Sequence, residues 1–202
     1  MINSFSNKTR TKKIIVTPKI FIVRETMNIR TATNRDRDDV LRIYSSAFPD
    51  DESESVSRLA VDLLSENTTP ETLCLLAEAE GAVVGHIAFS PVAIGNSETC
   101  QGYILAPLAV QTDYQKRRIG SRLIEYGLRQ LSLAGVTIVF VYGDPDYYGR
   151  FGFSADAAID YKAPYALEYP FGWQAVVLCE CAIEKPPVTI TCVPALCHSE
   201  LW

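Results

Sequence analysis

The sequence lacks any apolar run of the roughly 18 to 20 residues that a membrane-spanning helix needs, because Pro, Gly or a charged residue interrupts every candidate. It has only two histidines and six cysteines. The cysteines show no C-x2-C spacing and the histidines no H-x3-H spacing. Structural zinc sites usually draw their ligands from such patterns, so the sequence predicts no metal site. A chain this long and apolar does not need disulfides, and we expect a cytoplasmic protein with reduced thiols and no membrane partner.

Basic residues are scarce outside one segment. The formal net charge is -5, and residues 1–27 carry six basic side chains against one acid, which leaves -10 for the rest. An acidic body argues against a nucleic-acid partner. We expect residues 1–27 to be a disordered basic extension. A targeting peptide is the alternative, although Pro18 and Lys19 split the apolar stretch that a secretory signal would keep whole.

The remaining residues fit one domain. A chain of 202 residues with 48% hydrophobic content can bury a sizeable core. We place the domain at residues 28–184, followed by a C-terminal tail at 185–202. No internal repeat or low-complexity segment interrupts it.

Two helices are expected early in the domain. Thr33, followed three residues later by Asp36, resembles a capping box, and apolar residues recur with helical spacing over 40–48. A second, weaker helical pattern covers 54–64, after an acidic turn at 50–52.

The rest of the domain reads as strands around one long helix. Apolar or β-rich runs predict strands at 28–33, 72–79, 82–89, 101–110, 136–142 and 174–182, with one more strand near the C-terminus. The long helix is expected over 114–134. Pro107 has no N–H and belongs at an edge, at a bulge or where the sheet opens. This order indicates a mixed α/β sheet.

A candidate phosphate site precedes the long helix, at residues 115–121 (QKRRIGS). A helix N-terminus presents unpaired N–H groups and a partial positive charge, and a small residue such as Gly120 lets a phosphate approach the backbone. The positive charges of Lys116, Arg117 and Arg118 interact unfavourably with the positive end of the helix dipole, which is a reason to expect a bound anion there. The alternative is a solvated helix end. A nucleotide-phosphate enzyme would use the same helix end, but no GKS, GKT or G-x-G-x-x-G motif is present after a strand.

A second candidate site follows the strand at 136–142, in the segment 143–153 (GDPDYYGRFGF). Two adjacent tyrosines in so short a turn put one phenol toward the core and leave the other free for a cleft. The alternative is that Tyr147 and Tyr148 are both packing residues.

In this order, these residues resemble the GCN5-related N-acetyltransferase (GNAT) superfamily, and its bacterial branch with LAPLAV, YQ, IG, GDP, YY and RFGF segments in particular. The resemblance runs from about Ile29 to Leu178. The family's pyrophosphate motif begins with Arg or Gln, matched by Gln115, and ends with Gly or Ala, matched by Gly120. Arg118 stands where the family usually has its first glycine, so we expect an unstrained backbone there and a salt bridge from Arg118 to a CoA phosphate.

The resemblance implies a GNAT-like fold, with a mixed, mostly antiparallel central sheet that is flanked by helices and splayed between its fourth and fifth strands. It implies acetyl-CoA as cosubstrate and a primary amine of a small molecule, peptide or protein as acceptor. Backbone groups of the third run would bind the pantetheine arm and polarise the thioester. The cofactor-binding residues so implied are Leu108, Ala109, Val110, Gln115, Lys116, Arg117, Arg118, Ile119, Gly120 and Ser121.

Tyr148, four residues before Gly152, matches the family's usual general acid, which protonates the departing CoA thiolate. Glu54, Glu98, Asp144 and ordered water are candidates for the base. A module that binds CoA or acyl-CoA without turnover is the alternative function, and Tyr148 argues against it. We expect a monomer or a homodimer.

Overall fold

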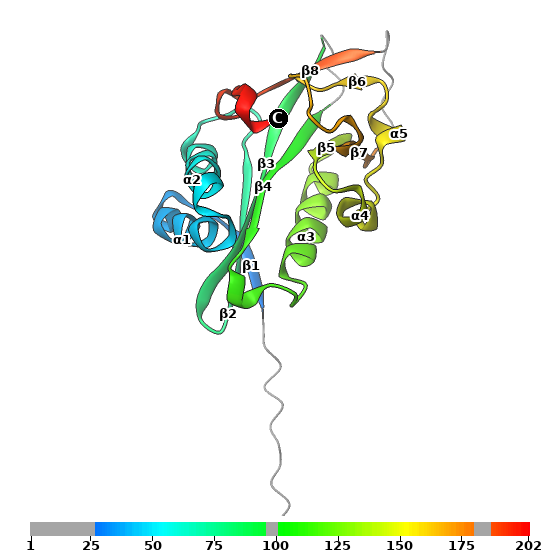
Figure 1. The fold of residues 1–202 in the computed structure, drawn as a ribbon. Coiled ribbons are helices and arrows are strands. Elements are labelled where there is room, and N and C mark those ends of the chain that lie inside the picture. Colours follow the sequence, from blue (N-terminus) through cyan, green and yellow to red (C-terminus); the bar gives the residue numbers. More distant parts are fainter. Residues whose placement is uncertain (1–26, 96–100, 180–186) are drawn as a thin grey trace, which may run out of the picture.

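The computed structural model describes residues 27–95, 101–179 and 187–202. The predicted basic extension therefore lies outside the described residues, except for Met27. A central sheet separates α1 and α2 on one face from α3 on the other (Figure 1). The helices are α1 (Arg37–Ala47), α2 (Asp50–Ser65), α3 (Ile119–Leu133), α4 (Pro145–Tyr148) and α5 (Ala155–Ala158). In the described part of the chain, no helix is long and apolar enough to cross a membrane.

The strands follow the order β1-β2-β3-β4-β5-β7, with β8 paired to the far end of β3 and β6 paired to β8. Most pairs are antiparallel, while β4 and β5 run parallel. This arrangement confirms the expected mixed, mostly antiparallel sheet. The strands are β1 (Asn28–Thr31), β2 (Leu73–Ala79), β3 (Ala82–Ile94), β4 (Gly102–Val110), β5 (Ile138–Tyr142), β6 (Tyr161–Lys162), β7 (Trp173–Val177) and β8 (Val188–Cys192).

Several predicted boundaries were wrong. The acidic turn at 50–52 is the first turn of α2, where acidic side chains favour the helix dipole, so this helix starts four residues early. Strand β3 continues to Ile94, five residues beyond its predicted end, because its second half pairs with β4 and β8. Helix α3 begins at Ile119, since a separate 3-10 turn occupies 112–114. Of the strand predicted at 174–182, β7 covers the first part, and 180–182 lie outside the described residues.

The sheet opens between β4 and β5, as predicted. The two strands pair only over Gly102–Ile104 and Ile138–Phe140, so β4 continues beyond Ile104 without β5 beside it. On its other side β4 stays paired with β3, and the register skips a residue opposite the segment that contains Pro107. A proline without an N–H fits such a bulge, so one residue marks both the bulge and the opening.

Helix α3 packs unusually close to the sheet at Gly127. A Cβ atom at this position would lie 2.1 Å from Cε2 of Phe89, which is fully buried in β3. The glycine therefore permits the close approach of α3 to the sheet.

We expect Gly127→Ala to lower the free energy of unfolding by about 1 to 3 kcal/mol, because overpacking outweighs the better helix propensity of alanine. Urea unfolding measures this loss. Gly149→Ala is the matched control, since a Cβ atom there meets nothing within 4 Å and the backbone is helical. Equal stabilities of the two variants would show that α3 can move away from Phe89 without loss.

Candidate active site

The backbone of β4 faces the opening with every second residue. The Gln111 N–H donates to the Val84 carbonyl at 2.9 Å, so Gln111 is turned toward β3. In an antiparallel ladder neighbouring residues point their N–H and C=O groups to opposite sides. Val110 is therefore turned to the opening, and its carbonyl accepts a hydrogen bond from Gln115 Nε2 at 3.2 Å.

The same alternation divides the three residues predicted to bind pantetheine. Leu108 is two residues before Val110 in the same unbroken register, so its N–H also faces the opening. Ala109 is paired with His86 and turns its backbone groups toward β3. Leu108 and Val110 are thus the two of the three whose amides are available to a ligand in the opening.

The N-terminus of α3 lies beside this strand. Its first backbone hydrogen bond runs from Arg122 N–H to Arg118 O at 3.1 Å, so the amides of residues 119–121 precede the bonded part of the helix. A Cβ atom at Gly120 would lie 3.7 Å from Val110 Cγ2 and 3.9 Å from Leu108 Cδ2. The amides at the start of α3 therefore lie next to the outward-facing amides of Leu108 and Val110 in β4.

The loop before α3 is strained at two non-glycine residues. Arg118 has φ 61° and ψ 19°, and Lys116 has φ 61°. The expectation of an unstrained backbone at Arg118 was wrong, because the chain keeps the left-handed conformation that the family's glycine would adopt freely. For an L-residue this conformation costs about 1 kcal/mol or more.

The three cations of this loop differ in their surroundings. Arg117 forms an ion pair with Glu80 at 3.0 Å and lies over the Tyr114 ring at 4.9 Å, which ties it to the β2–β3 hairpin. Lys116 and Arg118 are exposed to solvent. The predicted cluster is therefore one structural arginine and two solvent-facing cations beside the helix N-terminus.

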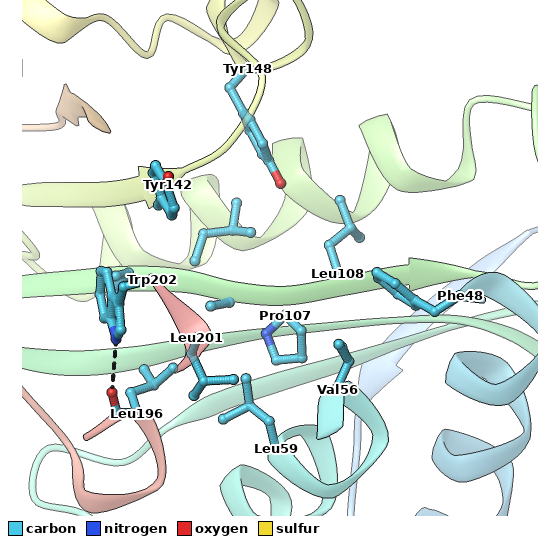
Figure 2. Close-up of a pocket in the computed structure, with 13 residues that line it drawn as sticks. Phe48, Val56, Leu59, Pro107, Leu108, Tyr142, Tyr148, Leu196, Leu201 and Trp202 are labelled. Carbon is cyan, nitrogen blue, oxygen red and sulfur yellow. Dashed lines mark hydrogen bonds between the residues drawn. The ribbon is translucent and has the colours of Figure 1, made fainter. Parts of the chain in front are cut away.

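Tyr148 projects from α4 into the opening, and Figure 2 shows its hydroxyl directed toward β4. Burial, with smaller effects of Tyr147 and Asp144, raises the pKa of the Tyr148 phenol well above its ordinary value. The phenol is therefore protonated at neutral pH and can donate its proton. Among the described residues, no side chain or backbone group hydrogen bonds to its hydroxyl.

Gly143, the first residue of the segment 143–153, makes room for this ring. A Cβ atom at Gly143 would lie 2.6 Å from Cε2 of Tyr148. The Asp144 side chain caps α4 by accepting from the Asp146 N–H at 2.9 Å, and this fixes the turn that carries Tyr148.

The Tyr147 side chain lies elsewhere than that of Tyr148. A Cβ atom at Gly120 would lie 2.9 Å from the Tyr147 hydroxyl, so this hydroxyl lies against the first turn of α3. Burial raises the pKa of Tyr147 above its ordinary value. The sequence predicted one phenol toward the core and one in a cleft, whereas the Tyr147 hydroxyl lies against the first turn of α3 and Tyr148 lines the cavity at the opening.

A cavity of about 290 Å³ lies where β4 leaves β5. One side consists of residues 104–108 of β4, with Tyr142 at the end of β5 and Tyr148 (Figure 2). The facing wall is apolar and comes from the residue that follows α1, from α2 and from the segment 193–202: it consists of Phe48, Val56, Leu59, Leu196, Leu201 and Trp202.

Sequence patterns did not reveal the contribution of residues 193–202. Two 3-10 turns, Pro194–Leu196 and Ser199–Leu201, carry the side chains of this segment onto the core. The only local signal was the apolar spacing of Leu196, Leu201 and Trp202, which is too short to show a period.

The two candidate bases in the described part of the chain, Glu54 and Asp144, do not line the cavity. Glu54 is paired with Arg58 at 3.0 Å and is 82% exposed on the outer face of α2. Asp144 is occupied as the cap of α4. Glu98 lies outside the described residues.

Comparison with known proteins points to one family. A family model described as an acetyltransferase (GNAT) domain matches residues 28–155. The chain is 37% identical over 137 residues to the "Uncharacterized N-acetyltransferase YjhQ" of Escherichia coli K12, which covers 66% of this chain and 73% of that protein. It is 38% identical over 112 residues to the E. coli K12 "Uncharacterized N-acetyltransferase YhbS", covering 55% of this chain and 65% of that protein.

Solved structures agree. The crystal structure of E. coli YhbS in complex with CoA matches with a TM-score of 0.74 at 26% identity, over 86% of this chain and 93% of that one. A GNAT acetyltransferase from Brucella melitensis in complex with acetyl-CoA matches with a TM-score of 0.60 at 30% identity, over 85% and 98% of the two chains.

Proposed function

Since this chain belongs to the GNAT acetyltransferase family, we propose that it is an acetyl-CoA-dependent N-acetyltransferase whose acceptor is a primary amine of a small molecule, peptide or protein. One observation carries the proposal: the free amides of α3, the outward-facing amides of β4 and the Tyr148 hydroxyl follow one another along a single opening of the sheet. An extended cofactor with a phosphate end and a thioester end fits this order.

The first turn of α3 would hold the pyrophosphate. The amides of Ile119, Gly120 and Ser121 point at the approaching anion, and the helix dipole adds to the attraction. Lys116 and Arg118 are the exposed cations on this side, whereas Arg117 supports the loop through Glu80.

The outward amides of Leu108 and Val110 would bind the pantetheine arm. Leu108 also lines the cavity that Tyr148 enters, so its N–H is the donor best placed to polarise the thioester carbonyl. Removal of one such donor typically slows an acyl transfer by about 10²- to 10³-fold.

Tyr148 would act at the sulfur. The neutral amine attacks the carbonyl carbon, a C–N bond forms and the C–S bond breaks, while Tyr148 donates its proton to the departing thiolate. The amine gives up two protons overall, one before and one after attack, and one of them restores the phenol. Because no candidate carboxylate lines the cavity in the described residues, ordered water is the base that best fits this site.

A turnover screen tests the proposal. Acetyl-CoA is incubated with the protein and a panel of amines, and free CoA and acetylated products are measured by thiol assay and mass spectrometry. We expect at least one acetylated amine. Binding of acetyl-CoA without any product would instead support the alternative, a CoA-binding module without turnover.

Acetyl-CoA alone should stabilise the fold. At a hundred times its dissociation constant, a ligand that binds only the folded state contributes about 2.7 kcal/mol. For a chain of this size the melting temperature should rise by about 5 to 10 °C, measurable by differential scanning fluorimetry. No shift with saturating acetyl-CoA would remove the cofactor assignment.

Arg118→Gly separates backbone strain from charge. We expect stability to change by less than about 1 kcal/mol, since relief of the left-handed strain is offset by the greater freedom of glycine in the unfolded chain. Acetyl-CoA affinity should fall about tenfold if the guanidinium contacts a phosphate. Isothermal titration measures this loss. Arg118→Asn, which tolerates the same backbone without the charge, should lose affinity equally, and full affinity in both variants would show that Arg118 is only solvated.

A further inference from the structure

The cavity beside Tyr148 has apolar walls on the side away from β4. Phe48 directly follows α1, Val56 comes from α2, and Leu201 and Trp202 complete the wall. In the part of the chain that the structure describes, no charged side chain lines this cavity. An amine that reacts at the thioester would therefore stand among apolar groups and tyrosine hydroxyls.

The polar groups of the cavity wall differ in whether they already form hydrogen bonds within the protein. The Tyr142 hydroxyl accepts a hydrogen bond from the Tyr169 N–H at 2.9 Å, and the Trp202 indole N–H donates to the Leu196 carbonyl at 3.2 Å (Figure 2). The indole N–H is thus already engaged within the protein, whereas the Tyr142 hydroxyl uses only an acceptor position. The Tyr148 hydroxyl is the polar group of the wall that is directed toward β4 (Figure 2).

The apolar wall is fixed in place. The Trp202 ring lies 6.1 Å from the ring of Trp173 and 6.1 Å from that of Tyr165, and its N–H is held by Leu196. Trp173 in turn stacks on the buried Phe140 at 5.3 Å. A wall anchored in the core is a preformed surface for a ligand.

We infer that the acceptor is a small amine with one positive charge and an aromatic or branched aliphatic body, of the arylalkylamine type. This inference rests on the function proposed above. An apolar wall disfavours the charged form of an amine, which promotes the neutral nucleophile without a nearby carboxylate. A second or third ammonium group, as in a polyamine or an aminoglycoside, would find no partner in this wall.

The volume of the cavity also fits a small amine with one ring. A dry apolar cavity of about 150 Å³ binds benzene, so about 290 Å³ accommodates one ring and a short chain beside the acetyl group. The aromatic side chains Phe48, Tyr142 and Trp202 provide faces and edges against which such a ring packs. A folded peptide segment would need a longer open groove.

The test compares 2-phenylethylamine and tryptamine with spermidine, kanamycin and a peptide with a free leucine N-terminus, all with acetyl-CoA and the full chain. We expect kcat/KM for the two arylalkylamines to exceed that for spermidine and kanamycin by at least about 100-fold, because the additional ammonium groups are desolvated without partners. Preferred acetylation of spermidine, kanamycin or the peptide would overturn the inference and leave the proposed function intact. Absence of any product together with absence of acetyl-CoA binding would overturn both.

Two variants connect the preference to the wall. Trp202→Ala should raise KM for 2-phenylethylamine about tenfold, and Trp202→Phe should restore most of the loss. Val56→Asp should lower kcat/KM for 2-phenylethylamine at least tenfold and raise it for spermidine. Leu133→Ala, a truncation on α3 at a side chain that is 75% exposed, is the control and should change neither.

The acetyl-CoA melting shift shows whether each variant is folded and binds the cofactor. With that shift retained, an unchanged amine preference in both Trp202→Ala and Val56→Asp would overturn the assignment of this wall to the acceptor.

Discussion

Gly120→Asp should abolish the stabilisation of this protein by acetyl-CoA, with a loss of affinity of at least about 100-fold. The substitution puts a carboxylate where the pyrophosphate approaches the first turn of α3, and charge repulsion is strong next to a desolvated phosphate. The added Cβ atom would also lie 2.9 Å from the Tyr147 hydroxyl and would displace it. Isothermal titration and the melting shift both measure the effect.

The fold itself should tolerate this change. An acidic residue in the first turn of a helix is favourable to the dipole, so the melting temperature without ligand should stay the same or rise slightly. Gly120→Ala is the matched control: it adds the methyl group without the charge and needs only a small shift of the Tyr147 tip, so we expect a loss of a few-fold. An unchanged affinity in Gly120→Asp would move the phosphate site elsewhere on the molecule.

The opening of the sheet could be predicted from the sequence because Pro107 lacks the N–H that a paired strand would need. Pro107 cannot donate to a neighbouring strand, and the structure places it opposite a register skip, beyond the point where β5 leaves β4. The apolar run at 136–142 likewise predicted a strand covered on both faces, which β5 is. Local chemistry was sufficient where the constraint was a missing hydrogen-bond donor or an uninterrupted apolar run.

The backbone at Arg118 could not be predicted in this way. Propensity argues against a left-handed arginine, yet the turn between β4 and α3 requires that conformation, and the packing of α3 on Phe89 fixes the turn. Tertiary packing thus overrides the local preference at the residue that departs from the family's pattern.

The apolar wall of the cavity depends on contacts between distant parts of the chain. Trp202, Phe48 and Val56 line one cavity, although Trp202 is about 150 residues away from the other two in the sequence. No periodic pattern in residues 193–202 announces this contact, because two short 3-10 turns bring the side chains together. The sequence therefore predicted the cofactor side of the site in more detail than its acceptor side.

Tyr148→Phe should reduce turnover by about 10²-fold while acetyl-CoA affinity changes little. The ring and its packing in the space left by Gly143 are kept, and only the hydroxyl that points toward β4 is removed. The expected loss is at the low end of general-acid effects, because a thiolate whose pKa is near 8.5 already leaves fairly well. Single-turnover measurements with saturating acetyl-CoA and amine separate this chemical step from binding.

The structure changes what the neighbouring variant should show. Tyr147→Phe removes the hydroxyl that lies against Gly120 in the first turn of α3, so we expect it to weaken acetyl-CoA binding by a few-fold and to leave the chemical step nearly unchanged. Tyr126→Phe, at a phenol that is 38% exposed on α3 and away from the cavity, is the control for the loss of a hydroxyl alone. Equal losses of turnover in Tyr147→Phe and Tyr148→Phe would favour a structural role for the pair.

The pH dependence gives an independent test of the same assignment. Because burial raises the pKa of Tyr148 above its ordinary value near 10, the phenol keeps its proton throughout the range in which an amine substrate loses its own. The rate should therefore rise with pH as the neutral amine accumulates, and it should show no fall below about pH 10 from loss of the acid. A descending limb near pH 8 that disappears in Tyr148→Phe would assign the phenol a lowered pKa and contradict the buried geometry. The same limb in both proteins would point to another group, and full activity in Tyr148→Phe would transfer the proton donation to water.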